Sequence, residues 1–364
     1  MSGTSADGVD AALVRVDGRG MQMKAALLGH AHEPYASQIR EAIFVARAGG
    51  TQGQQVSLAS LARLGRDVAL AYAAAVQKVL AQACVHAKDV LAVAAHGQTL
   101  FHDPPNTIQW IDPALLAAET GCAVVSDFRR ADLAAGGQGA PLVPFADYVL
   151  FRHPTKNRVL LNLGGIANFT WLPAGGTSSD VIAFDTGPAN CVVDELMKPH
   201  IDTGGERALR GRVNETIVED VLHASYFDRT PPKSTDGPEM IAAFRAAQAK
   251  RAEVTQLDDL LATACAVTAT SVARAIKRWC PGKVDELIAS GGGTKNAAIM
   301  SMLRARLPDV SVSTLDEVGM PTDAKEAVAF ALLAAATLDG EPSNVPAATG
   351  ARRAVVLGSI TPKP

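Results

Sequence analysis

The chain has 364 residues, 48% of them hydrophobic, and this length and apolar content suit two domains, each with its own core. Its net charge of −3 comes from interspersed acids and bases, which argues against a nucleic-acid or anionic-lipid partner. No uninterrupted apolar run has membrane-spanning length and no charged-then-apolar leader opens the chain, so we expect a cytoplasmic protein without a membrane partner.

The cysteines lie far apart and form no Cys-x-x-Cys pair, which argues against a zinc site or a disulfide framework. We expect five buried free thiols: Cys84, Cys122, Cys191, Cys265 and Cys280. Aromatic residues make up only 5% of the chain, so recognition of single strands by base stacking is not expected.

The first ten residues, Met1–Asp10, place two glycines, three hydroxyl side chains and two carboxylates in one turn. Glycines let a backbone approach a ligand and hydroxyls add short donors, which is what cradling a phosphate requires. A polar surface hairpin is the alternative. Residues 11–16 predict the strand that leads away from this turn, and residues 23–28 predict a second strand.

The next segments follow the order helix, strand, polar loop, as in a layered α/β protein. Apolar spacing predicts a long helix over 58–85, and 89–95 is a short apolar strand. Polar side chains at the end of that strand favour a ligand such as a sugar, although ordinary loop histidines would look the same. They are His96, Gln98, Thr99, His102 and Asp103. Strands over 107–110 and 123–126 flank a predicted helix over 113–120.

Charged residues follow the strand at 123–126, among them Asp127 and Arg129. They form either a solvated patch or, because a glycine-rich segment follows, the lip of a cleft. We place a domain boundary near that segment, residues 136–141, and treat its glycines as a candidate hinge.

The second half opens with a hairpin of the same kind as the first. Residues 158–163 and 166–172 are predicted strands, and Gly164 and Gly165 form the turn between them. Two such hairpins suggest a duplicated fold with a ligand between its halves, although the letters alone show no repeat.

Asp185 comes directly after a buried strand predicted over 180–184, and a Gly-Pro turn follows it. A carboxylate held rigidly at a sheet edge is typical of a catalytic group. Capping of the helix predicted over 190–197 is the alternative for Asp185, but Asn190 could cap that helix and leave Asp185 free for chemistry.

The remaining segments predict helices over 217–225 and 257–279, with a loop over 231–239 between them. A strand over 285–290 runs into three glycines, 291–293, and then into a helix over 297–307. Glycines at such a point bring the backbone against a flat ligand, and the helix N-terminus supplies N–H groups for anions. The pattern is neither a Rossmann fingerprint nor a Walker A sequence.

Near the C-terminus we expect a strand over 310–314, a helix over 322–336 and an edge strand over 354–358. Asp323 and Glu326 share one face of that helix near its N-terminus. They either face a ligand or only favour the helix dipole.

Taken together in chain order, these segments resemble the anhydro-N-acetylmuramic acid kinase family of bacterial cell-wall recycling. The resemblance covers nearly the whole chain, and the combination of motifs is specific although each is weak alone. The matching stretches are Met1–Asp10, His96–Thr99 with His102, Ser126–Arg129, Gly136–Pro141, Leu161–Asn168, Phe184–Asn190, Pro231–Thr235, Gly291–Gly293 with Asn296, Asp323–Ala331 and Thr349–Ala351.

The resemblance implies an α/β, two-domain actin/Hsp70/hexokinase-like (ribonuclease H-like) fold with an inter-domain cleft. We expect domain I to comprise residues 1–133 plus 338–364 and domain II residues 134–337. The two hairpins would be the phosphate-binding turns, and the glycines at 291–293 the turn on the adenosine side.

The resemblance also implies an ATP- and Mg²⁺-dependent kinase that opens 1,6-anhydro-N-acetylmuramic acid with water and gives N-acetylmuramic acid 6-phosphate. Asp185 would be the general base, and Glu326 would help to orient the sugar or the water. We expect Mg²⁺ to be held through ATP and water, near Asp7, and a homodimer is an open possibility. The expected nucleotide-binding residues are Gly3, Thr4, Ser5, Ala6, Asp7, Gly8, Val9, Asp10, Gly164, Gly165, Asn168, Gly291, Gly292, Gly293 and Asn296; the expected sugar-binding residues are His96, Gln98, Thr99, Asp127 and Arg129.

The chain departs from the family pattern at two places. The residues after Lys-Ser-Thr are Asp236–Glu239 in place of Gly-Arg-Glu, so we assign no arginine role there. A phosphate turn needs a strand on each side, and we expect residues upstream of Met1 to supply the incoming one. Two other functions stay open: a kinase of the same fold acting on another small sugar, and a non-catalytic nucleotide-binding protein.

Overall fold

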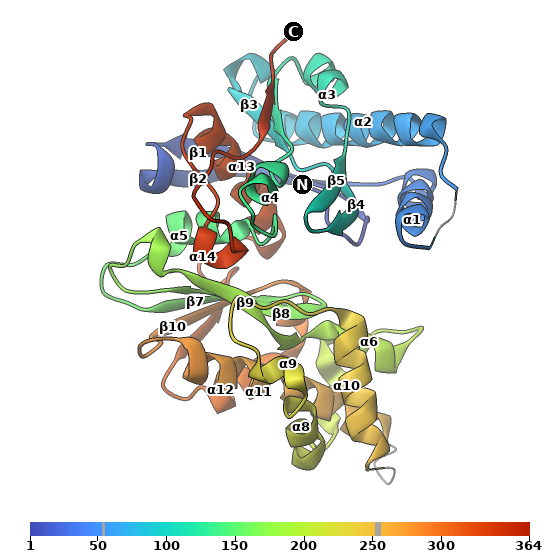
Figure 1. Cartoon of the computed structure of the whole chain (residues 1–364), viewed down its shortest axis with the longest axis vertical. Coiled ribbons are helices and arrows are strands. Elements are labelled where there is room, and N and C mark those ends of the chain that lie inside the picture. The colour runs from blue at the N-terminus through green and yellow to red at the C-terminus, as the bar shows by residue number, and fades with distance from the viewer. Residues whose placement is uncertain (53–54, 252–255) are drawn as a thin grey trace. The chain divides into compact units, whose positions relative to one another are not determined.

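The computed structural model describes residues 1–52, 55–251 and 256–364 (Figure 1). The chain divides into two compact units: unit 1 is Met1–Leu150 with Asp323–Pro364, and unit 2 is Phe151–Thr322. Both units are mixtures of helices and strands, so the predicted two-domain α/β class is confirmed.

Unit 2 is built on a five-stranded sheet with the order β11-β10-β7-β8-β9. Its first three strands in the chain pair antiparallel, and its last two run parallel to the first of them. Counted along the chain, the order is 3-2-1-4-5, which is the ribonuclease H-like arrangement that the resemblance implies. The strands are β7 (Arg158–Leu163), β8 (Ile166–Leu172), β9 (Ile182–Pro188), β10 (Glu286–Ser290) and β11 (Ser311–Thr314).

The core of unit 2 is centred on helix α11 (Leu257–Trp279), which packs against β9 and neighbouring helices. α11 has the length and apolar composition of a membrane span, but 83% of its most apolar stretch is buried inside the protein. α11 is therefore a core helix of unit 2. The other helices of unit 2 are α6 (Asn190–Met197), α7 (Glu206–Arg210), α8 (Glu215–Leu222), α9 (Ser225–Asp228), α10 (Gly237–Ala249) and α12 (Ala297–Arg306).

Unit 1 contains three small sheets among its described residues. β1 (Gly8–Asp17) pairs antiparallel with β2 (Lys24–Pro34). β6 (Ala123–Ser126) lies between β3 (Ala92–Ala95), which is parallel to it, and β12 (Ser359–Thr361), which is antiparallel. β4 (Gln98–Asp103) and β5 (Asn106–Trp110) form a hairpin. The helices are α1 (Ser37–Gln52), α2 (Leu58–Gln82), α3 (Pro113–Thr120), α4 (Arg130–Ala134), α5 (Val143–Phe151), α13 (Lys325–Leu338) and α14 (Pro346–Thr349).

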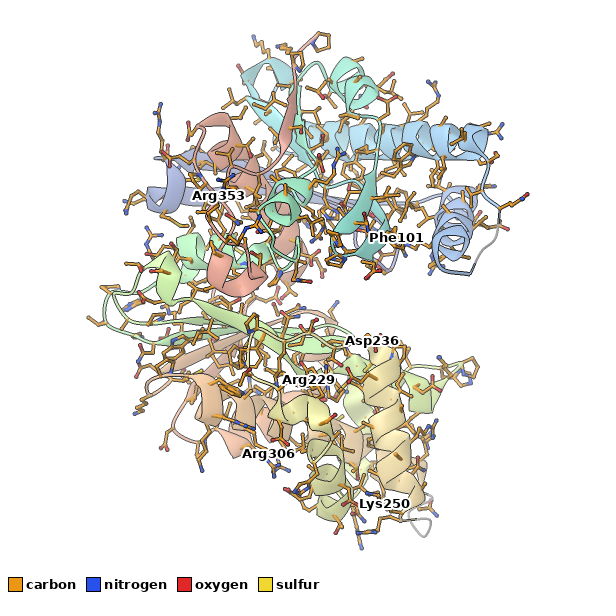
Figure 2. The ribbon with its side chains drawn as sticks, in the orientation of Figure 1. Phe101, Arg229, Asp236, Lys250, Arg306 and Arg353 are labelled. Carbon is orange, nitrogen blue, oxygen red and sulfur yellow. The ribbon has the colours of Figure 1, made fainter. Side chains whose placement is uncertain are left out.

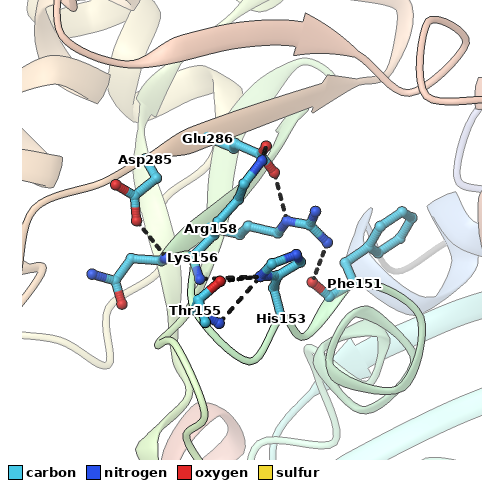
Figure 3. A network of polar contacts seen from close by, with 8 residues as sticks. Phe151, His153, Thr155, Lys156, Arg158, Asp285 and Glu286 are labelled. Carbon is cyan, nitrogen blue, oxygen red and sulfur yellow. Dashed lines mark hydrogen bonds and ion pairs between the residues drawn. The ribbon is translucent and has the colours of Figure 1, made fainter.

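The boundaries of the units, at 150/151 and 322/323, differ from the predicted 133/134 and 337/338. A buried ion pair of 3.1 Å between Lys325 of α13 and Asp147 of α5 joins these two helices within unit 1. At the start of unit 2, Arg158 on β7 bonds both Glu286 of β10 and the carbonyl of Phe151, which ties the incoming chain to the sheet (Figure 3). The boundaries thus follow contacts between residues distant in sequence.

The glycine-rich segment at 136–141 was predicted to mark a domain boundary, but it lies inside unit 1. It wraps around Asp132, whose fully buried carboxylate accepts hydrogen bonds from Gly139 N, Asn344 Nδ2 and Thr349 Oγ1 at 2.7–2.8 Å. A Cβ at Gly137 would lie 2.2 Å from Asp132 Oδ2. These glycines let the backbone close around a buried charge that must be satisfied.

Several other expectations are corrected by the structure. The strand β4 and the helices α1, α4, α5, α7, α10 and α14 occupy segments predicted as loops or left unassigned. The last strand is Ser359–Thr361 rather than 354–358. Of the five cysteines expected to be buried, Cys84 is exposed and Cys191 and Cys280 are only partly buried.

The segment at 236–239, where the chain departs from the family pattern, is the start of α10 (Figure 2). Asp236 is the N-cap and accepts a bond from Glu239 N at 2.8 Å, and Pro238 stands in the first turn. Thr235 Oγ1 donates to the Glu239 carboxylate at 2.6 Å. The altered residues therefore form a helix N-terminus with its own capping interactions.

Replacing this cap should loosen the start of α10. Asp236→Ala is expected to cost about 1 kcal/mol locally, so the Glu239 amide should exchange with deuterium about five times faster. Asp228→Ala is the matched control, because that exposed carboxylate makes one surface ion pair with Arg278. Equal exchange of Glu239 in both variants would contradict the cap assignment.

Candidate functional site

The turn at Met1–Asp10 in unit 1 is an ordered loop that leads into β1. Ala6 N donates to Gly3 O, and the buried Ala6 holds a left-handed φ of 50°. Such a conformation is uncommon outside glycine and marks a backbone held by its surroundings. Ser5 Oγ donates to Asp7 Oδ1 at 2.9 Å, so a hydroxyl and a carboxylate are fixed side by side in the turn.

Two residues outside the turn hold it in place. The fully buried Gln98 accepts from Ser2 Oγ at 2.7 Å and donates to Gly3 O at 2.9 Å. Arg47 of α1 donates to Thr4 O at 2.5 Å and to Thr99 O at 2.9 Å. Gln98, expected to bind the sugar, thus engages its amide with the turn, and Arg47 is a site residue that the sequence prediction missed.

The glycines expected at the nucleotide fall into two groups. Gly8, Gly291 and Gly293 are required by the fold, because an added Cβ would lie 2.4–2.7 Å from neighbouring atoms of the protein. At the others an added Cβ would meet nothing closer than 3.6 Å. Glycine at these positions leaves room for a ligand at the backbone rather than for a neighbour. The second group is Gly3, Gly164, Gly165 and Gly292.

The second glycine turn joins β7 to β8 in unit 2. The start of α6 braces it: Asn190 N and Nδ2 donate to Gly164 O, and the Ala189 and Cys191 amides donate to Gly165 O, all at 2.9–3.1 Å. Asn190 was expected to cap α6 with its side chain, but no side-chain cap is present there. Its side chain holds the second glycine turn instead.

The three-glycine loop follows β10 and lies against the end of β7, where Cβ atoms at Gly291 and Gly293 would meet Leu163. The second turn and this loop therefore share one edge of the unit 2 sheet. Asn296, expected to bind nucleotide, is buried, and its side chain caps α12 by accepting from Ala298 N and Ile299 N. Asn168 lies opposite Asp185 in the β8–β9 ladder near the same edge.

Asp185 lies inside β9 rather than after its end. Three bonds fix its position: Thr235 N donates to Oδ2 at 3.0 Å, Tyr226 OH donates to its carbonyl, and its amide donates to Lys233 O. Burial raises the pKa of Asp185 to about 6, against the lowering effect of the Thr235 hydrogen bond. A carboxylate with this pKa, fixed by its backbone, has the properties of a general base at neutral pH.

The polar residues of unit 1 form a cluster around His96 and Arg129. Arg129 Nε donates to His96 Nε2 at 3.1 Å, so His96 carries its proton on Nδ1, which donates to Gly97 O at 2.9 Å. Burial lowers the pKa of His96 well below its usual range. Burial lowers the pKa of Arg129 to about 10, offset by the nearby Glu326 carboxylate. Arg129 thus stays charged at neutral pH beside a neutral histidine.

Two other expected sugar-binding residues, Asp127 and Thr99, bond to partners other than His96 and Arg129. Asp127 holds a left-handed φ of 60° and pairs with Arg130, whose Nη2 lies 2.6 Å from its Oδ2. Thr99 accepts from Arg47 through its carbonyl. Tyr226 and Thr235, which position Asp185, were not predicted. Thr235 lies in a segment that resembles the family, but the sequence gives no sign that its backbone amide bonds the Asp185 carboxylate.

Within the residues that the structure describes, no group of three or more His, Cys, Asp or Glu side chains is arranged to hold a metal ion. The residues that fit a phosphate-bound Mg²⁺ are Asp7 and Ser5, side by side in the first turn.

The chain has two α/β units, and unit 2 is built on a sheet of the order 3-2-1-4-5; this defines the class as a two-domain α/β protein of the ribonuclease H-like fold. A family model described as anhydro-N-acetylmuramic acid kinase matches residues 1–363. The chain belongs to that family.

Curated relatives agree with this assignment. The anhydro-N-acetylmuramic acid kinase of Caldanaerobacter subterraneus subsp. tengcongensis is 40% identical over 381 residues, which covers 99% of this chain and 95% of the relative. The kinase of the same name from Bacillus cereus is 39% identical over 376 residues, covering 99% of this chain and 97% of the relative.

The raised pKa of Asp185 has a consequence for stability. The folded protein binds this proton more tightly than the unfolded chain, so the stability it contributes is full below pH 3.8 and is lost as the pH rises through about 6. Asp185→Asn should therefore raise the free energy of unfolding by up to about 3 kcal/mol at pH 7.5 and by little at pH 4. Denaturant unfolding at both pH values tests this; an Asn variant that is less stable at pH 7.5 would contradict it.

Proposed function

We propose that this protein transfers the γ-phosphoryl group of ATP to O6 of 1,6-anhydro-N-acetylmuramic acid while water opens the anhydro bond, giving N-acetylmuramic acid 6-phosphate and ADP. We place this reaction in cell-wall recycling in the cytoplasm. Membership of the family over residues 1–363 supports the substrate. The observation that carries the mechanism is the partly buried Asp185 carboxylate, held by the Thr235 amide, with its raised pKa.

The chemistry needs one base and no separate acid. Water attacks C1, the bond between C1 and O6 breaks, and O6 forms its new bond to the γ-phosphorus as ADP leaves. Asp185 takes the proton from the attacking water, a contribution typically of about 10²–10⁴-fold. Phosphorus captures the leaving oxygen in place of the proton that a glycosidase acid would supply.

The glycines with open space at the Cβ position fit the phosphates of ATP. We assign backbone contacts with phosphate to Gly3 in the first turn and Gly164 and Gly165 in the second, and contact with the adenosine side to Gly292. Mg²⁺, when bound with ATP, neutralises charge that develops on the phosphates. We place it near Asp7, whose carboxylate the Ser5 hydroxyl orients.

The charged Arg129 and the neutral His96 fit the sugar. A buried guanidinium suits the lactyl carboxylate of the substrate, and the bond to His96 fixes its orientation. Glu326, which acts electrostatically on Arg129, keeps the role of orienting the sugar or water. Gln98 contributes through the turn that it holds.

Asp185→Asn is expected to lower kcat by about 10²–10⁴-fold and to leave ATP affinity unchanged, because the amide cannot take a proton from water. In the unaltered protein kcat/KM should rise with pH through about 6, since the base must be ionised. Steady-state kinetics with the anhydro sugar between pH 5 and 8 measure both. Near-normal turnover of the Asn variant would overturn the assignment of Asp185.

The two groups of glycines give a matched pair of variants. Gly3→Ala should fold normally and bind ATP about tenfold more weakly, because its Cβ meets the ligand and not the protein. Gly8→Ala should destabilise the fold, because its Cβ would lie 2.4 Å from Glu33 O. Thermal unfolding and ATP titration separate the effects; unchanged ATP affinity in Gly3→Ala would remove the first turn from the nucleotide site.

A further inference from the structure

Lys233 is bonded both to the main chain of Asp185 and to the end of helix α9. It belongs to the loop at 231–235, between α9 and α10. Its carbonyl accepts a hydrogen bond from the Asp185 amide at 3.1 Å. Its ammonium group donates to the carbonyls of Tyr226 and Phe227, each at 3.2 Å. One residue therefore links the strand that carries the proposed base to a neighbouring helix.

These bonds are part of a closed ring of three hydrogen bonds. The Asp185 amide donates to the Lys233 carbonyl, the Lys233 ammonium group donates to the Tyr226 carbonyl, and the Tyr226 hydroxyl donates to the Asp185 carbonyl. Thr235, two residues after Lys233, supplies the amide that bonds Asp185 Oδ2 at 3.0 Å. A movement of the loop away from α9 would therefore take this amide away from the carboxylate.

Aromatic rings also hold the Lys233 ammonium group. Its Nζ lies 4.6 Å from the centre of the Tyr226 ring and 5.8 Å from that of the Phe184 ring, and both aromatic residues are buried. A cation near such ring faces is attracted to them. The last carbonyls of a helix have no partner within the helix, and lysine is a suitable donor to them. Carbonyls and rings together thus define one place for this ammonium group.

Three charged side chains act on Lys233. Asp228 and Arg229, the latter labelled in Figure 2, lie at the end of α9, and Arg278 lies on α11. Burial is the main cause that lowers the pKa of Lys233 to about 8, and the positive charges of Arg278 and Arg229 add to it. The Asp228 carboxylate opposes them. Lys233 is therefore largely protonated at pH 7 and below.

The Asp185 carboxylate is affected by the loop through one bond. Burial raises its pKa, and the hydrogen bond from the Thr235 amide lowers it. Lys233 therefore acts on this carboxylate through the position of the loop rather than through its own charge.

We propose that Lys233 is a positioning residue for the base: its ammonium group holds the loop at 231–235 against α9 and so keeps the Thr235 amide on the Asp185 carboxylate. This inference rests on the proposed function for the role of Asp185. Without the ammonium group the loop moves, the amide bond weakens, and burial acts on the carboxylate with less opposition. The pKa of Asp185 then rises, and less of the base is ionised at a given pH.

Lys233→Met tests this, because it removes the charge and the donors but keeps an unbranched side chain against the rings. The Thr235 amide should exchange with deuterium about tenfold faster. The rise of kcat/KM with pH, centred at about 6, should move upward by about half a pH unit or more. Hydrogen exchange uses the full chain without sugar or ATP, and the kinetics cover pH 5 to 7, where Lys233 is charged.

Two further variants serve as comparisons. Lys233→Arg keeps a cation that can donate to the same carbonyls and lie over the same rings, so it should preserve the exchange rate within about twofold and leave the pH profile in place. Lys78→Met is the matched control. The Lys78 ammonium group also donates to a main-chain carbonyl, that of His32 at 2.8 Å, but in unit 1. This control should change neither quantity.

Unchanged Thr235 exchange or an unmoved pH profile in Lys233→Met would overturn the proposal, as would a Lys233→Arg variant that behaves like Lys233→Met. Weaker ATP binding with an unmoved profile would make Lys233 a ligand contact instead. The exchange measurement needs no turnover. A failure of the proposed function, seen as no reaction of the unaltered protein with the anhydro sugar, is therefore distinct from a failure of this inference, seen as unchanged exchange.

Discussion

The proposed mechanism depends on the hydrogen bond from the Thr235 amide to the Asp185 carboxylate. This bond favours the ionised carboxylate, whereas burial of the same group disfavours it. Burial alone would favour a protonated, inert acid, and strong hydrogen bonding alone would favour an unreactive carboxylate of low pKa. The single amide leaves the pKa near 6, between these limits. Because β9 and the loop at 231–235 hold the main chain of Asp185, the carboxylate is fixed without using its second oxygen for support.

The glycine turns, like Asp185, are held mainly through their backbone groups. Gln98 and Arg47 hold the first turn through the carbonyls of Gly3 and Thr4, with a further bond from the Ser2 hydroxyl to Gln98, and α6 holds the carbonyls of the second turn. Supports that use carbonyl groups leave the glycine faces of both turns to a ligand, which agrees with the open space at the Cβ positions of Gly3 and Gly164. Turns of this kind bind phosphate because their shape is set before the ligand arrives.

Much of the fold could be predicted because local sequence patterns, such as apolar periodicity and glycine turns, determine these helices and strands. The periodic helix at 257–279 and the hairpin around Gly164 and Gly165 were both found with their observed bounds. What depends on distant partners could not be predicted. The unit boundaries rest on pairs such as Lys325 with Asp147, and the glycines at 136–141 serve Asp132, whose other partners lie more than 200 positions away.

The candidate site shows the same division. Asp185 was proposed as the catalytic base from its place at a buried strand. The hydrogen bond from the Thr235 backbone amide that holds its carboxylate could not be predicted, because it does not depend on the identity of residue 235. The helix cap formed by Asn296 was not predicted, because an asparagine that caps a helix and one that binds nucleotide look alike in sequence. The cap at Asp236 could have been found, since Asp-Gly-Pro-Glu is a helix-start pattern.

The central claim is that water, and not the sugar's own hydroxyl, attacks C1 while O6 accepts the phosphoryl group. Turnover of the anhydro sugar with ATP in ¹⁸O-labelled water, quenched early and read by mass spectrometry, tests this most directly. The account predicts one ¹⁸O in the sugar part of the product, at C1, and none in the transferred phosphoryl group. A phosphorylated sugar without ¹⁸O, or label found in phosphate instead, would contradict it.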